Sequence, residues 1–93
     1  MFTVTTPYFL INVITKSEVA EHLVPNIRNF EIVYYIKEEF KGGKAKETEE
    51  KDIVKVQMLC SRGKLGEIMN YLKEHYVNRY GAVCYYEEVN VPV

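Results

Sequence analysis

The fold is decided by residues 30–60, which read FEIVYYIKEEF KGGKAKETEEKD IVKVQMLC in three parts. In 30–40 and again in 53–60, successive side chains fall into two alternating sets, with the period of two that is typical of a β-strand. Residues 41–52 show no period, begin with Lys-Gly-Gly, and are rich in lysine and acidic residues, so they predict an exposed, flexible loop. The segment therefore predicts a hairpin of two strands with a long connection.

A strand and a helix are predicted before this hairpin. Residues 9–14 form an apolar run that is too short for an ordinary helix and predicts a buried strand. Thr15 and Glu18 have the spacing of a capping box, and apolar residues follow at helical intervals, so a helix is expected to start there. Pro25 has no backbone N–H to donate, and we expect the helix to end near Val24.

A second helix and a last strand are predicted after the hairpin. Ser61 is a suitable N-cap, and an apolar stripe follows it at helical spacing. The stripe consists of Leu65, Ile68, Met69, Leu72 and Tyr76. Gly81 interrupts the pattern, and residues 82–91 then alternate as a strand does.

These elements fit one small domain that spans residues 1–93. Their order folds most simply into a four-stranded antiparallel sheet with both helices on one face and right-handed crossovers. This is the α+β, ferredoxin-like βαββαβ arrangement. The third and fourth strands then flank the first, which places Cys60 and Cys84 roughly 10 Å apart, too far to form a disulfide.

The sheet face opposite the helices is expected to be covered by another subunit. The strand at 30–40 has apolar or aromatic side chains on both faces, with Val33 and Tyr35 opposite Ile32 and Tyr34. An open face of this kind would expose a larger apolar patch than monomers usually tolerate. The sequence therefore predicts an oligomer.

Composition excludes several classes of protein. Twelve Lys and Arg residues against 13 Asp and Glu residues give a net charge of -1, so no general basic field attracts nucleic acid. No transmembrane run and no signal-peptide pattern is seen, so we expect a cytoplasmic protein. His22 and His75 have no second ligand at helical spacing, and no nucleophile is paired with a base. Neither an enzyme, a metal site nor a resident cofactor is expected.

Two segments are candidates for anion binding. Residues 41–44, Lys-Gly-Gly-Lys, combine glycines that let backbone N–H groups approach a phosphate with lysines that supply charge. A plain flexible loop is the alternative. Arg62 and Lys64 open the second helix, whose N-terminal backbone donors favour anions, although a solvated helix start is the simpler explanation.

Residues 75–85, HYVNRYGAVCY, together with the Gly-Gly-Lys at 42–44, resemble segments of the PII-like signalling proteins. The resemblance is closest to members associated with bicarbonate transporters and carboxysomes. The matching positions in the later segment are Tyr76, Asn78, Tyr80, Gly81, Ala82 and Tyr85.

The resemblance implies a homotrimer that binds an adenine nucleotide, either ATP, ADP, AMP or cyclic AMP, in clefts between subunits, with bicarbonate as a further ligand. It implies that Gly42, Gly43 and Lys44 contact phosphate, to which we add Arg62 from the helix start. Tyr80, Gly81 and Ala82 would form the turn that closes the cleft. The loop at 41–52 would dock on a partner such as a membrane transporter, so that the protein becomes peripheral at the membrane through that partner.

One departure from the resemblance leaves a second family open. The bicarbonate-associated members carry Ser and Arg after Gly-Gly-Lys, whereas residues 45–50 here are largely acidic. Carboxylates close to a phosphate repel it. The CutA-like proteins share the fold, are trimers linked to divalent-metal tolerance, and have an acidic second hairpin, so they are the alternative without nucleotide binding.

Overall fold

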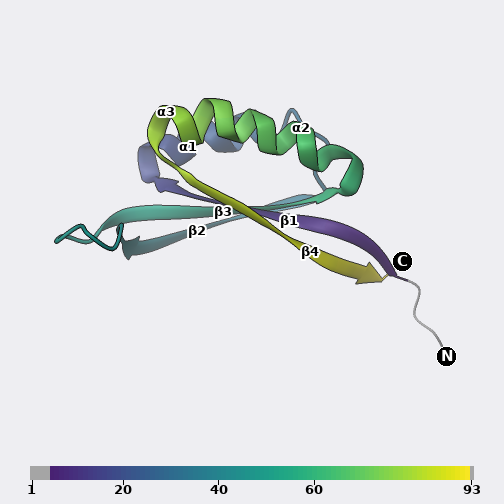
Figure 1. The fold of residues 1–93 in the computed structure, drawn as a ribbon, viewed down its shortest axis with the longest axis horizontal. Helices are drawn as coiled ribbons and strands as arrows, with labels where there is room; N and C mark the ends of the chain where they lie inside the picture. Colours follow the sequence, from purple (N-terminus) through teal and green to yellow (C-terminus); the bar gives the residue numbers. More distant parts are fainter. Residues whose placement is uncertain (1–4, 93) are drawn as a thin grey trace.

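The computed structural model describes residues 5–92, and its order of elements confirms the predicted arrangement (Figure 1). The strands are β1 (Thr5–Lys16), β2 (Tyr34–Gly42), β3 (Lys51–Ser61) and β4 (Val83–Pro92). The helical segments are α1 (Ser17–Ile27), α2 (Arg62–Leu72), the π-helical turn η1 (Lys73–Val77) and α3 (Asn78–Tyr80). Because α2, η1 and α3 follow one another without a break, they together form the second predicted helix.

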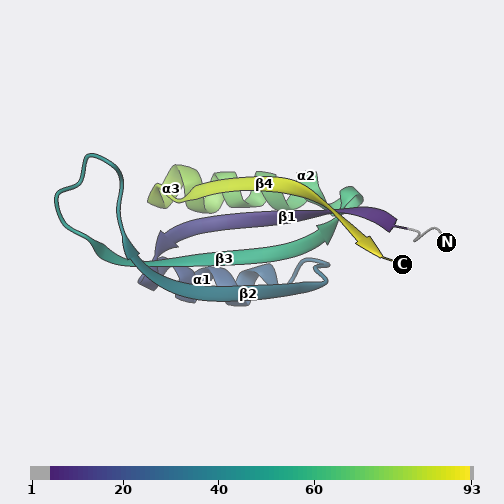
Figure 2. The same ribbon diagram turned by 90° about the horizontal axis from the view of Figure 1, so that it is seen from below.

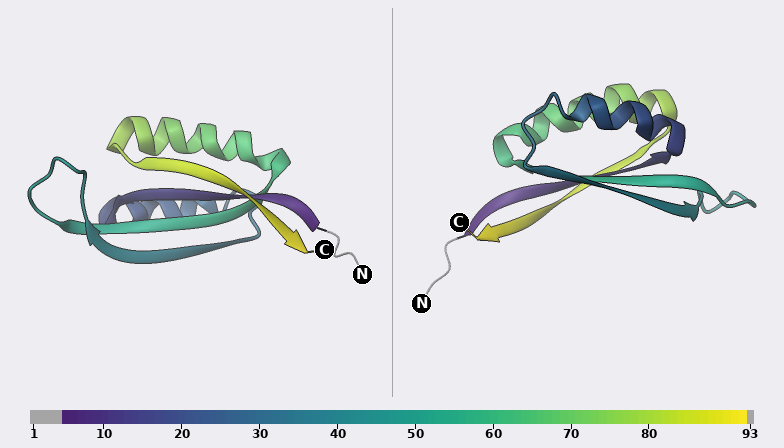
Figure 3. Two further views of the ribbon diagram at one scale, coloured as in Figure 1. Left: turned by 60° about the horizontal axis from the view of Figure 1, so that its bottom comes forward. Right: turned by 180° about the vertical axis from the view of Figure 1, so that it is seen from behind.

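The four strands form one antiparallel sheet in the order β2-β3-β1-β4. As predicted, β3 and β4 flank β1. Figure 2 shows the connection between β2 and β3 projecting beyond the end of the sheet. The helices all lie on one face of the sheet, which the right-hand view of Figure 3 makes clear. The fold is therefore the predicted α+β, ferredoxin-like βαββαβ arrangement.

The hydrophobic core lies between the helices and the sheet face that they cover. The register of β1 against β3 pairs Ile11 with Met58 and Val13 with Val56, and all four side chains are fully buried. The helices contribute Val19, Ala20, Leu23, Ile27, Ile68, Leu72 and Tyr76. Alternate residues of each central strand face the core, which explains the period of two in the sequence.

The first helix begins later than the sequence predicts. Thr15 is not its cap: it is a buried residue of β1 that pairs with Val54 of β3. The N-cap position is Lys16, and no side chain caps the helix there. The capping-box prediction was wrong because β1 is a central strand, whose backbone groups are satisfied by its neighbours up to the start of the helix.

The first helix also ends later than the sequence predicts. It continues through Pro25 to Ile27, which is fully buried in the core. Asn26, next to the proline, donates a hydrogen bond of 3.0 Å from Nδ2 to the Tyr76 hydroxyl. These contacts offset the backbone hydrogen bond that a proline removes, so the helix keeps its last turn.

The hairpin strands have different limits from those predicted. The Phe30 N–H donates to the Ile27 carbonyl at 3.1 Å, and the Phe30 ring packs against Tyr71 with 4.9 Å between centroids. Phe30 therefore belongs to a turn that follows α1, and β2 starts only at Tyr34. At the other end both strands extend into the predicted loop, so the connection comprises residues 43–50.

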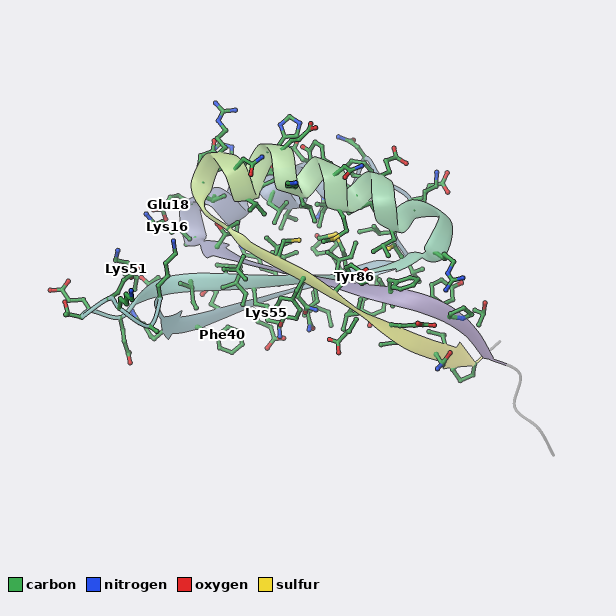
Figure 4. All side chains as sticks on the ribbon, in the orientation of Figure 1. Lys16, Glu18, Phe40, Lys51, Lys55 and Tyr86 are labelled. Atoms are coloured by element: carbon green, nitrogen blue, oxygen red, sulfur yellow. The ribbon has the colours of Figure 1, made fainter. Side chains whose placement is uncertain are left out.

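The sheet face away from the helices carries apolar side chains. Five of these residues are 42–50% exposed: Tyr34, Ile36 and Phe40 of β2, and Val83 and Tyr85 of β4. In Figure 4 the labelled Phe40 points away from the helices. The strand register places all five on the face opposite to the core.

Two smaller predictions can also be compared with the structure. Cys60 and Cys84 are free thiols, as expected from their separation in the sheet. Ser61 occupies the predicted N-cap position of α2, but its side chain makes no capping hydrogen bond.

Within residues 5–92, no helix is long and apolar enough to cross a membrane.

Candidate functional site

A cleft of about 390 Å³ opens at the end of the sheet where β1 runs into α1 and the hairpin connection begins. Three parts of the chain line it. They are Ile14, Thr15 and Lys16 of β1, then Gly42, Gly43, Lys44, Glu47, Lys51 and Ile53 of the hairpin, and Tyr80, Gly81 and Val83 at the corner before β4. Figure 4 labels Lys16 and Lys51 at this end of the molecule.

The cleft brings together five of the seven residues that sequence analysis selected. Gly42, Gly43 and Lys44 meet Tyr80 and Gly81 across it. An ideal Cβ built on Gly81 would lie 3.7 Å from Nζ of Lys44, which places the two selected segments in close contact. The antiparallel sheet causes this meeting, because the end of β2 and the start of β4 lie at the same end of the sheet.

Two selected residues do not line the cleft. Ala82 is 5% exposed and belongs to the hydrophobic core behind the turn. Arg62 lies at the other end of the sheet, because its neighbour Ser61 pairs with Tyr8, whereas Lys16 marks the cleft end of β1. Eight residues of strand separate these two ends, roughly 26 Å. Arg62 therefore cannot join Gly42 and Gly43 around this cleft within one chain.

Gly81 gives the corner between α3 and β4 its shape. Its φ of 71° and ψ of 23° are left-handed, a conformation that glycine adopts without a steric penalty. The Gly81 N–H donates to the Val77 carbonyl at 3.0 Å, and the Ala82 N–H donates to the Tyr76 carbonyl at 3.2 Å. These bonds satisfy carbonyls at the end of the helix and turn the chain sharply into β4 at the cleft wall.

Gly43 allows the hairpin connection to fold closely on itself. A Cβ at this position would lie 2.9 Å from Oε2 of Glu47, which is closer than ordinary van der Waals contact. The Glu47 N–H donates to the Lys44 carbonyl at 2.9 Å, so residues 44–47 form a turn. The absence of a side chain at Gly43 therefore lets the Glu47 carboxylate reach the cleft.

The charge lining the cleft is mainly positive. Lys16, Lys44 and Lys51 contribute three ammonium groups, and Glu47 contributes one carboxylate. Nζ of Lys51 lies 3.6 Å from Oε2 of Glu47. Sequence analysis missed Lys16 and Lys51, although the pairing of Lys16 with Ile53 and of Gly42 with Lys51 would have pointed to them had the register been known.

A smaller cavity of about 200 Å³ lies between α1 and the end of the second helical segment. It is lined by His22, Asn26, Tyr71, His75, Tyr76, Arg79 and Tyr80. Burial raises the pKa of Tyr71 here. His22 and His75 both border this cavity, but among residues 5–92 no group of three or more His, Cys, Asp or Glu side chains is placed to hold a metal ion.

Neither thiol lines the cleft: Cys60 pairs with Phe9 and Cys84 with Val13, which places both on the covered side of the sheet. Burial raises the pKa of Cys60 and raises that of Cys84 to about 11. A thiol with a raised pKa is less often ionised at neutral pH and is a weaker nucleophile for that reason. Neither thiol therefore contributes a reactive group to the cleft.

Comparison with known proteins gives matches in structure but not in sequence. Neither the models of known protein families nor the curated proteins match this chain. A PII-like signalling protein from Thermus thermophilus matches 95% of this chain and 92% of its own, with a TM-score of 0.77 and 21% identity. Apo CPII from Thiomonas intermedia K12, a nitrogen regulatory PII-like protein, matches 99% of both chains, with a TM-score of 0.83 and 11% identity.

A further structure of CPII carries ligands. It is bound to ADP, AMP and bicarbonate and matches 97% of this chain and 98% of its own, with a TM-score of 0.82 and 9% identity. The molecule described here is a ferredoxin-like domain with a positively charged cleft at one end of its sheet. Within that class, its fold is the fold of the PII-like signalling proteins.

Proposed function

We propose that this chain is a PII-like regulatory protein, not an enzyme, and that it binds an adenine nucleotide with its phosphates in the cleft. The observation that carries the proposal is the meeting of Gly42, Gly43 and Lys44 with Tyr80 and Gly81 around one cleft. These are residues that the resemblance to PII-like proteins implicates in binding. CPII, which shares the fold, has been captured with ADP, AMP and bicarbonate, and this supports the class of ligand.

The cleft offers groups suited to each part of a nucleotide. Backbone N–H groups beside Gly42 and Gly43 can approach a phosphate closely, and the neighbouring lysines supply the opposite charge. Tyr80 lines the cleft and is 46% exposed, so its ring is available to stack on adenine. The volume of about 390 Å³ lies within the range of roughly 300–1,000 Å³ found for small-molecule sites.

We propose that the exposed face of the sheet is covered by further copies of this chain in a homotrimer. The face combines apolar side chains near both edges of the sheet, such as Ile36 and Tyr85, with Glu38 and Lys55, which pair across β2 and β3. Apolar surface with both signs of charge is suited to a copy of itself. The nucleotide clefts would then be completed between subunits.

In this proposal the hairpin connection reports on the ligand. The connection comprises residues 43–50 and lies within the loop predicted at 41–52. It contributes Gly43, Lys44 and Glu47 to the cleft, and it also projects beyond the sheet (Figure 2). A ligand that binds one arrangement of the connection more tightly shifts the population toward it. The partner that responds would be a protein such as a membrane transporter, which would hold this cytoplasmic chain at the membrane.

Isothermal titration calorimetry with ATP, ADP, AMP and cyclic AMP, each with and without bicarbonate, tests the proposal. Binding of at least one nucleotide is expected. The absence of nucleotide binding, together with heat on addition of copper or another divalent metal, would refute it and favour the CutA-like alternative. Light scattering tests the assembly, with an expected mass of three times the 10.9 kDa of the chain.

A matched pair of variants locates the binding site. Gly43→Asp places a negative charge and a side chain at the cleft, and it is expected to abolish nucleotide binding while the assembly stays folded. Gly66→Asp adds the same side chain at a position inside α2 where a Cβ meets nothing within 4 Å, and it should leave the affinity unchanged. Equal affinity in the two variants would remove the Gly-Gly turn from the site.

A further inference from the structure

Glu47 is an acidic residue in a cleft that otherwise carries only positive charge. It lies in the hairpin connection, where its side chain is 34% exposed. Its carboxylate faces Lys51 at 3.6 Å, and its backbone N–H holds the turn with Lys44. The turn and the ion pair therefore place this carboxylate at the cleft wall.

The other acidic residues near the connection are arranged differently. Asp52 forms an ion pair with Lys41 across the two strands, and both side chains are well exposed. Glu49 and Glu50 do not line the cleft. Glu47 is thus the acidic residue of this segment that lines the cleft.

The ion pair between Lys51 and Glu47 limits the positive charge that is available to a bound phosphate. Lys16 and Lys44 also line the cleft, and within residues 5–92 neither forms an ion pair like the one between Lys51 and Glu47. A ligand with one phosphate can be neutralised by these two lysines and leave the pair intact. A longer chain of phosphates must either displace Glu47 from Lys51 or lie against its carboxylate, and both cost free energy.

We propose that Glu47 determines the specificity of the cleft, by competing with ligand phosphates for Lys51 and so favouring ligands with one phosphate group over ligands with three. This proposal rests on the proposed nucleotide function. It also explains how the connection would respond to a bound ligand. A ligand that binds Lys51 breaks the ion pair between Lys51 and Glu47, which joins the 44–47 turn to the start of β3.

The test compares AMP and ATP binding by calorimetry at low ionic strength in the wild type and in Glu47→Gln. The substitution keeps the shape of the side chain and removes its charge. The affinity for ATP should rise by about tenfold, and that for AMP by less than about threefold. Glu50→Gln, which removes the same charge outside the cleft, should change both affinities by less than about twofold. Lys51→Gln combined with Glu47→Gln should cancel the gain for ATP.

The outcomes separate this inference from the function on which it rests. Equal gains for AMP and ATP, or a gain in Glu50→Gln as large as that in Glu47→Gln, would overturn the role of Glu47 while leaving nucleotide binding in place. Inorganic phosphate and tripolyphosphate provide a second comparison without adenine. If Glu47→Gln tightens tripolyphosphate selectively while no nucleotide binds, the role of Glu47 stands and the nucleotide function fails. If no phosphate compound binds any variant, both are refuted.

Discussion

Replacing Gly81 by alanine tests the backbone geometry on which the cleft wall depends. Gly81 is the residue within 5–92 that has a positive φ, at 71°. An alanine in this conformation brings its Cβ close to the following carbonyl oxygen, which costs about 1–2 kcal/mol. We therefore expect the substitution to lower the free energy of unfolding, even though Gly81 is exposed and packs against little.

The loss of unfolding free energy in Gly81→Ala has two possible sources, backbone strain and steric crowding of the new methyl group. The nearest atom to the new methyl group would be Lys44 Nζ at 3.7 Å, an ordinary contact with the end of a flexible side chain, so crowding adds little. The backbone term alone predicts a loss of about 1–2 kcal/mol, which corresponds to a fall in melting temperature of about 4–8 °C for each kcal/mol. Gly81→Asn should lose less, because asparagine tolerates the left-handed region better.

Gly66 provides the matched control. It lies inside α2, and a Cβ there would meet nothing within 4 Å. Gly66→Ala should raise the free energy of unfolding by about 0.5–1 kcal/mol, because alanine is the better helix residue. Urea denaturation at one fixed protein concentration measures all three variants. Backbone strain at Gly81 is refuted if Gly81→Ala is as stable as the wild type, or if Gly81→Asn loses as much free energy of unfolding as Gly81→Ala.

Three further predictions concern the core and the open face. Tyr76→Phe removes the acceptor for Asn26 Nδ2 and should cost about 0.5–1.5 kcal/mol in chemical denaturation, while Tyr80→Phe at a half-exposed ring should cost little. Burial raises the pKa of Cys84 from 9.0 to about 11. The neutral thiol therefore makes its full contribution to the free energy of unfolding below about pH 9, and this contribution is lost as the pH rises toward about 11. The unfolding free energy of the wild type should therefore fall more steeply across this window than that of Cys84→Ala, and parallel curves would contradict this. Ile36→Glu should reduce the mass measured by light scattering, because it places a charge on the exposed apolar face; an unchanged mass would exclude that face as the interface.

The sequence predicted those features of the fold that depend on periodicity. In β3 and α2 one side of the element is buried, and this produces the alternation of β3 and the apolar stripe of α2 in the sequence. The order of elements and the covered face of the sheet could be inferred from such patterns. The errors fall where tertiary contacts outweigh local preference. Pro25 stays within α1 because Ile27 is buried beyond it, and Phe30 leaves the strand because its ring packs against Tyr71.

The residues of the candidate site also differ in whether a local sequence pattern identifies them. Gly42, Gly43 and Lys44 could be selected from a short motif, since paired glycines between lysines have a local signature. Tyr80 and Gly81 were selected only through the resemblance to PII-like proteins. Arg62 was selected for a local reason as well, but the sheet places it at the far end. The sequence carries no local signal that two residues such as Lys16 and Lys51 face one cleft.

The sequence by itself determined the βαββαβ order, the two-faced character of the sheet and the end of the second helix at Gly81, because each follows from interactions between residues that are close along the chain. Only the tertiary structure decided which charges share a space. The register of β1 with β3 and of β2 with β3 brings Lys16, Lys44 and Lys51 to one end of the sheet, and the turn at 44–47 adds Glu47. The physical reason is that electrostatic interaction depends on distance through space, which strand pairing sets and sequence separation does not.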